Sequence, residues 1–494
     1  MHPYFQSIQQ QTRRQFLRNC NVGLGALAFG QLVGNAVASS PESALGEVVN
    51  PLAPKAPPLP AKAKRVIYLH MSGAPPQHDL WDYKPELVKH NMQPCPDDLL
   101  AILKKERLPF IDLNARRPKM LGTPHKFVKQ GESGIEVSEL LPEIGKHVDK
   151  LCVIKSMHTD QFNHAPAELF LYTGTPRSGG AAMGSWITYG LGSENQDLPG
   201  FVVLISGGTD PTGGKGLWST GFLPSVYQGV QCRSIGAPIL YASNPSGMDR
   251  EVRRRSLDAL KKLNELELSE FGDPETVTRI SQYELAYRMQ IAVPEVMDIA
   301  KESKETLEAY NAVPGQASFA NNCLLARRLA EQGVRYVQLY DWGWDMHGTA
   351  ADNDLVTGLP NKCKQVDKPI AALLKDLEQR DMLKDTLVIW GGEFGRTALN
   401  EERGGSKFLG RDHHPHCFSI WMAGGGIKPG MTYGETDEIG YFVADKKVGI
   451  RDLQATILNQ LGIDPKRFSY PYQGLNQRLI GPTDEGRVLR EILS

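Results

Sequence analysis

Several signatures of common protein classes are missing from the 494-residue sequence. It has no G-x-S-x-G motif, which argues against an ordinary serine esterase, and no H-E-x-x-H motif, the helical zinc signature of many metalloproteases. Its seven cysteines are scattered without a C-x-x-C pair, which argues against a disulfide framework and a zinc ribbon. A net charge of −1 gives no bulk attraction to nucleic acid. Beyond the N-terminal region, no stretch is long and apolar enough for a stable membrane span.

The N-terminal region has the pattern of an export signal. Residues 1–38 contain the pair Arg13-Arg14, an apolar stretch rich in Gly and Ala, and a small-residue cleavage pattern that ends at Ala38. This pattern predicts a signal peptide for the twin-arginine export machinery and a periplasmic or secreted protein; an uncleaved membrane anchor is the alternative. Residues 39–64 are rich in Pro and Ala, which is typical of a flexible or extended tether. The mature domain is therefore expected at residues 65–494.

Short apolar runs alternate with helical patterns along this domain. The runs suit strands buried on both faces of a sheet, and each leads into a polar or glycine-rich loop; they lie at 66–69, 151–154, 201–205, 334–340, 387–390 and 418–422. Segments between them carry apolar residues at helical spacing, and Pro369 is expected near the start of one such helix. This alternation predicts an α/β fold with a doubly wound, mostly parallel sheet. The charged stretch at about 248–312 is expected to form a helical insertion.

The loops that follow the predicted strands carry side chains suited to metal and anion chemistry. In a parallel sheet these loops meet at the carboxyl ends of the strands, and Gly424-Gly425-Gly426 is expected there as well. Asp345 and His347 combine a carboxylate with an imidazole, which suits zinc, manganese or iron. Glu393 is a candidate ligand and Arg396 a candidate anion clamp. A strand-to-helix turn with a surface salt bridge fits these last two residues equally well.

Three histidines within four positions, just ahead of a predicted buried strand, mark a further candidate site. At least one ligand is expected in the segment from Arg411 to His416, with Asp412 and His413 as the candidates. The stretch from 163 to 185 adds His164 and Ser185 as candidate catalytic residues. No serine there has a base nearby in the sequence, so an ordinary turn or cap residue is the alternative.

Taken together, these motifs resemble one family over nearly the whole mature chain. The segments that carry the resemblance are Ser72-Gly73 through Asp79, Asn163-His164-Ala165-Pro166-Ala167-Glu168, Met183-Gly184-Ser185-Trp186, Trp344-Asp345-Met346-His347, Gly391-Gly392-Glu393-Phe394-Gly395-Arg396-Thr397 and Gly410-Arg411-Asp412-His413. They are similar to the exported proteins grouped as domain of unknown function 1501. That family is placed with the alkaline phosphatase and sulfatase superfamily.

The resemblance implies an alkaline phosphatase-like sheet with up to two metal ions held by Asp and His at strand ends. By position, it implies ligand roles for Asp79, Asp345, His347 and His413. Glu393 stands where the superfamily usually has an Asp-His pair, which puts one metal ligand in doubt. A formylglycine sulfatase is disfavoured because the sequence has no Cys-x-Pro-Ser-Arg type motif.

The function that these observations favour is hydrolysis of phosphate or sulfate esters, on a small-molecule or polysaccharide substrate, with one or two divalent metal ions. Zinc, manganese and calcium are not distinguished. Ser185 is the candidate nucleophile, and a metal-bound water is the alternative. A non-catalytic exported binding or scaffold protein that keeps the fold is the rival interpretation.

Overall fold

The computed structural model describes residues 50–106, 113, 117–239, 244, 246–271, 274–483 and 486–494. The predicted export signal at 1–38 lies outside these residues. Among the described helices, none is long and apolar enough to cross a bilayer.

A nine-stranded sheet forms the centre of the molecule. Its strand order is β14 (Met431–Tyr433), β5 (Leu151–His158), β13 (Phe418–Ala423), β9 (Thr386–Gly391), β1 (Arg65–Ser72), β8 (Tyr336–Trp342), β6 (Phe201–Ser206) and β7 (Val230–Cys232), and β17 (Val448–Gly449) also pairs with β5. The expected mostly parallel sheet is confirmed, since β1 runs parallel to both of its neighbours, β8 and β9. These strands are almost entirely buried, as their continuous apolar character requires.

One strand departs from the expected direction. Strand β13 runs antiparallel to both β5 and β9. The glycines Gly424-Gly425-Gly426 that follow it therefore lie at the amino edge of the parallel strands, so the prediction that they lie at the carboxyl edge is wrong. By the same reversal, the histidines that precede β13 are delivered to the carboxyl edge.

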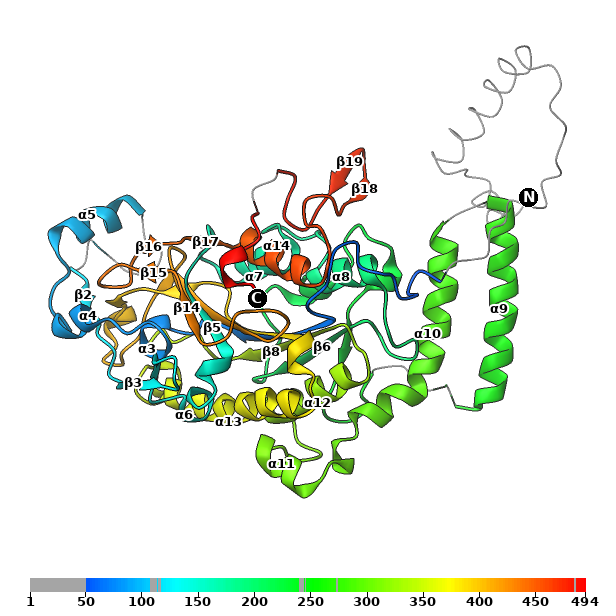
Figure 1. Cartoon of the computed structure of the whole chain (residues 1–494), viewed down its shortest axis with the longest axis horizontal. Coiled ribbons are helices and arrows are strands. Elements are labelled where there is room, and N and C mark those ends of the chain that lie inside the picture. Colours follow the sequence, from blue (N-terminus) through cyan, green and yellow to red (C-terminus); the bar gives the residue numbers. More distant parts are fainter. Residues whose placement is uncertain are drawn as a thin grey trace, which may run out of the picture.

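Helices cover both faces of the sheet (Figure 1). Helices α12 (Phe319–Glu331) and α13 (Gly358–Gln379) lie on one face, and α7 (His164–Thr173), α8 (Met183–Leu191) and α14 (Ile450–Gln460) lie on the other. Helix α12 ends just before Gly333, whose φ of 82° suits a glycine after a helix C-terminus. Pro369 lies inside α13 rather than near its start, because that helix already begins at Gly358.

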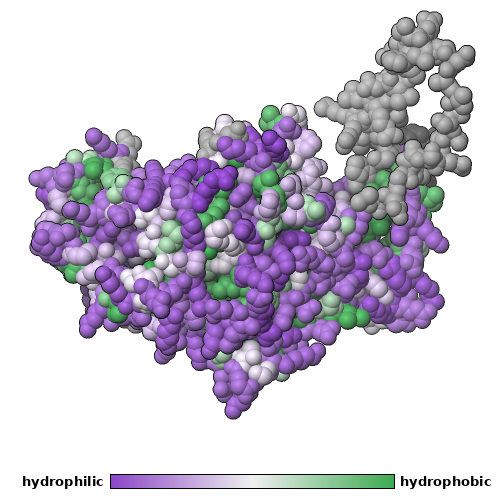
Figure 2. Space-filling view, in the orientation of Figure 1, coloured by the Kyte–Doolittle hydropathy of each residue, from purple (hydrophilic) through white to green (hydrophobic). Residues whose placement is uncertain are grey.

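Two long helices extend beyond the sheet at the right of Figure 1. They are α9 (Arg250–Phe271) and α10 (Pro274–Met297), and the shorter α11 (Lys304–Tyr310) follows them. Arg254 of α9 pairs with Glu284 of α10 at 2.6 Å, which ties the two helices together. The molecular face in Figure 2 is mostly hydrophilic over these helices, with hydrophobic side chains scattered among the charges.

Smaller elements complete the fold. The remaining helices are α3 (Gln77–Leu80), α4 (Pro85–Lys89), α5 (Asp97–Glu106) and α6 (Pro142–Gly145), and the short strands pair as β2 (Lys119–Met120) with β11 (Leu399–Asn400), β3 (Phe127–Gln130) with β4 (Ile135–Ser138), β10 (Gly395–Arg396) with β12 (His413–His414), β15 (Glu435–Thr436) with β16 (Val443–Asp445), and β18 (Tyr470–Tyr472) with β19 (Leu475–Gln477).

Residues 50–64, which the composition predicted as part of a tether, lie against the domain. Leu52 and Ala63 are buried. The backbone of Leu59 donates to Gly462, and the backbone of Lys62 donates to Gln460, each at 2.9 Å. These hydrogen bonds fix the segment on the domain surface, so residues before Arg65 are part of the fold.

Candidate metal centre

Five candidate residues meet at the carboxyl edge of the sheet because of how their elements run. Asp345 and His347 follow β8, and Glu393 follows the parallel strand β9. His413 lies in β12, just before the antiparallel β13, and His164 is the first residue of α7. Three strand connections and one helix start thus bring residues more than 200 positions apart into one site.

Three imidazoles surround one carboxylate oxygen. The Oδ1 atom of Asp345 lies 3.3 Å from Nε2 of His164 and 2.9 Å from Nε2 of His347. Nε2 of His413 lies 3.3 Å from the same oxygen. Two ligand atoms held about 2.1 Å from one ion at a tetrahedral angle are about 3.4 Å apart. The observed spacing therefore fits side chains that share a metal ion, which makes these four residues the candidate ligands.

The second ring nitrogen of each histidine has an acceptor of its own. Nδ1 of His164 lies 2.5 Å from Oε1 of Glu393, and Nδ1 of His413 lies 2.7 Å from the carbonyl oxygen of Phe162. Nδ1 of His347 contacts the carboxylate of Glu401. Metal-bound histidines nearly always donate their other N–H to a carboxylate or a carbonyl, which fixes the tautomer and the ring direction. All three histidines have that support here.

Arg396 holds Asp345 rather than facing a ligand. Its guanidinium is fully buried and donates to the carboxylate of Asp345. The remaining hydrogen bonds go to the backbone carbonyls of Gly73, Ala74 and Arg411. These contacts engage most of its N–H groups and join the Asp345 carboxylate to the turn after β1.

Gly73 allows the close approach on which this arrangement depends. Its φ is 104°, a conformation that side chains with a Cβ rarely adopt, and a Cβ there would lie 2.6 Å from the backbone nitrogen of Asp345. Its own N–H donates to Oε1 of Glu393 at 3.0 Å. The turn after β1 therefore links the Asp345 segment to Glu393.

Burial and charge act in opposite directions on these groups. Burial alone would raise the pKa of Asp345, but Arg396 and the histidines hold it well below its usual range. The neighbouring carboxylates outweigh burial at His164 and raise its pKa to about 9. At His413, burial dominates and lowers the pKa to about 3, so this imidazole is neutral. The side chain of Asp345 is 28% exposed, which leaves the cluster open to solvent.

A second cluster lies next to the first and is completely buried. Nε2 of His70, on β1, lies 3.3 Å from Oε2 of Glu393 and 3.5 Å from Oε1 of Glu168. None of the three side chains is exposed. Burial alone would lower the pKa of His70, but the two carboxylates raise it to about 9. Glu393 is shared between the clusters, with one oxygen toward His164 and the other toward His70.

Asp412 belongs to a third group, with His347 and Glu401, whose possible ligand atoms all lie within 4.8 Å of one another. One of its oxygens accepts from the backbone N–H of His413 at 2.7 Å. Burial and the nearby Glu401 carboxylate raise its pKa to about 7. Asp412 therefore lies close to both Glu401 and His347.

Two predicted site residues are not brought into these clusters. Asp79 forms a fully buried ion pair with Arg411, with both carboxylate oxygens accepting at 2.7 and 3.2 Å. Ser185 is fully buried in α8, and its hydroxyl donates to the carbonyl of Ser219. The structure thus places Asp79 against Arg411, and the one hydrogen bond of the Ser185 hydroxyl among the described residues goes to a backbone carbonyl.

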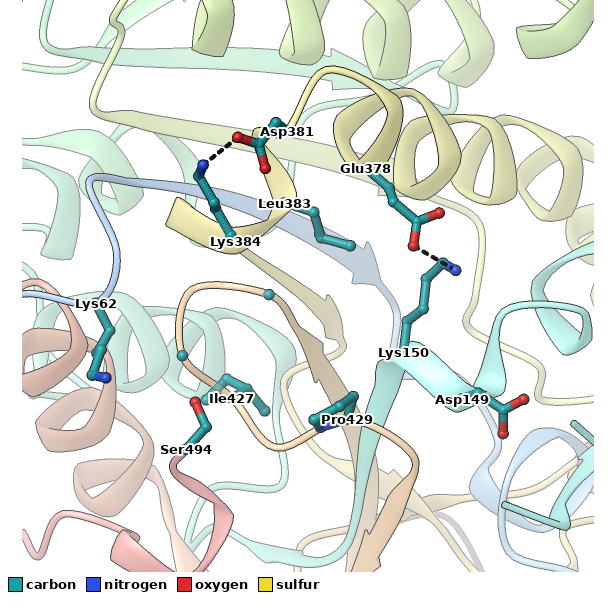
Figure 3. A pocket seen from close by; sticks show the side chains of 12 residues that line it. Lys62, Asp149, Lys150, Glu378, Asp381, Leu383, Lys384, Ile427, Pro429 and Ser494 are labelled. Atoms are coloured by element: carbon teal, nitrogen blue, oxygen red, sulfur yellow. Dashed lines mark hydrogen bonds and ion pairs between the residues drawn. The ribbon is translucent and has the colours of Figure 1, made fainter. Parts of the chain in front are cut away.

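A cavity of about 680 Å³ lies elsewhere. It is lined by residues that precede β5 and β9 and follow β13, so it opens at the amino edge of the sheet. Figure 3 shows two of its lysines in ion pairs, Lys150 with Glu378 and Lys384 with Asp381. The cavity therefore lies at the opposite edge of the sheet from the histidine cluster.

Two residues of the clusters escaped the sequence analysis. His70 directly follows the apolar run at 66–69 that predicts the first strand, and Glu401 lies beyond the glycine-rich segment 391–397. A histidine in the middle of a strand buried on both faces was the available signal for His70, because such a residue needs a polar partner. Glu401 had no comparable signal.

The fold and the clusters define an α/β protein with a candidate metal centre at the carboxyl edge of its sheet. Residues 63–493 match the family described as "Protein of unknown function (DUF1501)", and the protein belongs to that family. The membership expected from the sequence motifs is thereby confirmed. No curated protein is similar enough to the chain to count as a match.

Solved structures that resemble the chain do so distantly. They include a protein in the alkaline phosphatase superfamily from Vibrio parahaemolyticus, with 11% identity, 88% of this chain and 72% of that chain covered, and a TM-score of 0.34. The PsFucS1 sulfatase from Pseudoalteromonas sp. has 12% identity, 86% and 73% coverage and a TM-score of 0.36. The phosphonate monoester hydrolase of Agrobacterium radiobacter has 10% identity, 87% and 77% coverage and a TM-score of 0.35. Such distant likenesses carry no argument about chemistry, which rests on the residues of this chain.

Proposed function

We propose that the protein is a metal-dependent hydrolase of phosphate or sulfate esters, with its ion held by Asp345, His164, His347 and His413. These side chains supply one carboxylate and three imidazoles, a set that favours zinc, manganese or iron over calcium. The protein's own part is to fix these ligands and leave a face open to the substrate.

The observation that carries the proposal is the orientation of His413. Its Nδ1 lies 2.7 Å from the Phe162 carbonyl oxygen, which can only accept, so Nδ1 bears the hydrogen. Nε2 of the same ring lies 3.3 Å from the carboxylate oxygen of Asp345. Burial lowers the pKa of His413 to about 3, and in the neutral form Nε2 carries a lone pair that faces this oxygen. Two lone pairs that face each other repel. A cation between them turns this repulsion into two coordination bonds, so the residues present fit a metal ion.

His164 supports the same interpretation. Its Nε2 atom is buried and has no hydrogen-bond partner among the described residues, although it lies 3.3 Å from Asp345. A buried nitrogen without a hydrogen bond is costly unless something else binds it. When bound, a divalent ion at this position would polarise the ester oxygen and offset the charge that develops during hydrolysis.

We further propose that the substrate is a small-molecule or polysaccharide ester that reaches the ion from the exposed side of Asp345. Export by the twin-arginine machinery to the periplasm or the outside, with the signal at residues 1–38, is part of the proposal. It rests on the paired arginines and the cleavage pattern alone.

One observation favours the rival function, a binding or scaffold protein that holds a metal without turnover. Ser185, the candidate nucleophile, is buried, and among the described residues its hydroxyl bonds to the backbone carbonyl of Ser219 and to no base. In that case the ion would anchor an anionic ligand, and no ester would be cleaved.

The test compares the wild type with Asp345→Asn and with Asp352→Asn, an exposed control. Metal content is measured by inductively coupled plasma mass spectrometry, and turnover is measured with aryl phosphates and aryl sulfates. We expect Asp345→Asn alone to lose an ion and the activity. Full metal occupancy without turnover of either ester class would favour the binding function, and unchanged metal content in Asp345→Asn would refute the site.

A further inference from the structure

The buried cluster of His70, Glu168 and Glu393 contains several polar atoms without a hydrogen-bond partner among the described residues, and both ring nitrogens of His70 are among them. Oε2 of Glu168 accepts from the Thr212 hydroxyl at 2.9 Å and from the Gly213 N–H at 2.6 Å. Oε1 of Glu393 is likewise occupied by hydrogen bonds. The other oxygen of each carboxylate has no hydrogen bond among the described residues, and neither has Nε2 of His70.

These three unbonded atoms converge on one point. Nε2 of His70 is 3.3 Å from Oε2 of Glu393 and 3.5 Å from Oε1 of Glu168. Atoms that bind one ion at about 2.1 Å with a tetrahedral angle are about 3.4 Å apart. The spacing matches that of the open cluster at Asp345, and helix α7 contributes one residue to each group.

The charges of this cluster also call for a cation. Both carboxylates are fully buried, and in the described part of the chain no lysine or arginine forms an ion pair with either. The imidazole of His70 faces both carboxylates, and Glu393 also faces His164. A divalent ion with the two carboxylates and neutral His70 forms a group of zero net charge, and burying uncompensated charge is costly.

We propose that His70, Glu168 and Glu393 hold a second divalent cation, closed off from solvent, whose role is to fix Glu393 and through it His164. This inference deepens the proposed function, because Glu393 supports an imidazole of the open site with its other oxygen. One carboxylate-rich set with a single imidazole suits manganese, iron or zinc. Helix α7 carries both His164 and Glu168, one turn apart on the same face.

Burial gives the closed site a kinetic signature that the open site lacks. The open ion lies beside the exposed Asp345, so a chelator reaches it directly. The closed ion has no solvent-exposed ligand, and its release requires the surrounding elements to open. We therefore expect the two ions to leave the native protein in two separate phases.

The experiment measures the metal content of the full chain before and after EDTA treatment, with and without guanidinium. We expect two ions in the wild type, one lost rapidly to EDTA and one retained until unfolding. Glu168→Gln should lack only the slow ion, and Asp345→Asn only the fast one. Glu435→Gln, which changes an exposed carboxylate, serves as the control.

The outcomes separate the two proposals. A Glu168→Gln protein with wild-type metal content, or a wild type that yields all of its metal rapidly, overturns the closed site and leaves the open site standing. Loss of the slow ion alone in Asp345→Asn would refute the open site instead. If Glu168→Gln fails to fold, the release kinetics of the wild type still decide: a single fast phase overturns the inference.

Discussion

Nδ1 of His164 and Oε1 of Glu393 lie 2.5 Å apart and join the open cluster to the buried one. The hydrogen bond holds the imidazole so that Nε2 faces Asp345. The carboxylate also reaches His70 with its second oxygen, so one side chain supports two groups.

Glu393→Gln should therefore weaken metal binding at both clusters. Removal of a carboxylate that supports a metal-bound histidine typically lowers affinity about 10–100-fold. Glu401→Gln is the matched comparison, because Glu401 contacts His347 of the open cluster. Competition with a fluorescent chelator measures both affinities. If Glu393→Gln binds metal as tightly as the wild type, the link has no energetic role.

The metal-stripped protein should lose stability as the pH rises. The pKa of His164 and of His70 is raised to about 9 in the folded chain, against about 6.5 for an unfolded histidine. A raised pKa adds stability that is complete below pH ~6.5 and is lost as the pH rises through about 9, on the order of a few kcal/mol in all. Urea unfolding of protein refolded with EDTA, followed between pH 6 and 9.5 (the range set by these pKa values), checks this. A rise in stability over that interval would contradict it.

Asp79→Asn should destabilise the protein without changing its metal content. Its carboxylate pairs with Arg411, and neither side chain is exposed. Loss of one partner leaves a buried, unpaired charge and costs about 3–5 kcal/mol. Urea unfolding gives the free energy, and mass spectrometry gives the metal content. Loss of an ion with little change in stability would restore the ligand role that the sequence motif implies for Asp79.

Gly73→Ala should disturb the open site from outside the ligand set. A Cβ would meet the backbone of Asp345 at 2.6 Å, and the φ of 104° adds strain of about 1–3 kcal/mol. We expect weaker metal binding together with a lower melting temperature. Gly134→Ala is the control, since its φ is also positive but no atom lies within 4 Å of the added Cβ. Equal effects of the two substitutions would assign the loss to backbone strain alone.

Ser185→Ala should leave ester turnover unchanged. The hydroxyl donates to a backbone carbonyl inside the molecule, so its loss costs about 1 kcal/mol of stability and no catalytic group. Steady-state rates with aryl phosphates and aryl sulfates, together with thermal unfolding, check both parts. A large fall in kcat with normal metal content would make Ser185 the nucleophile after all.

Much of this architecture was predictable from the sequence, because strands buried on both faces read as continuous apolar runs. The helical spacing of apolar residues between these runs also predicted the helices that cover the sheet, α13 with its buried Ile370, Leu373, Leu374 and Leu377 among them. It did not give strand direction: nothing in residues 418–422 distinguishes an antiparallel strand from a parallel one. That is why Gly424 was expected at the wrong edge.

The candidate site was predictable in part for a related reason. Asp345, His347 and His413 lie in polar segments next to predicted strands, where residue types that bind metals can be recognised in the sequence. Their partners do not, since His70 is hidden in a strand and Asp79 is indistinguishable by residue type from a ligand until Arg411 is seen beside it. Contacts between side chains that are distant in the sequence depend on the fold, so they cannot be predicted from the local sequence.

His164 and Glu168 lie one turn apart on α7, so this helix connects the open cluster to the buried one. A rotation or slide of α7 that improves the fit of one residue must displace the other by a similar amount. Binding at the two proposed ion sites would then be thermodynamically linked, and the effect of the inner ion on the affinity for the outer ion would equal the effect of the outer ion on the affinity for the inner one.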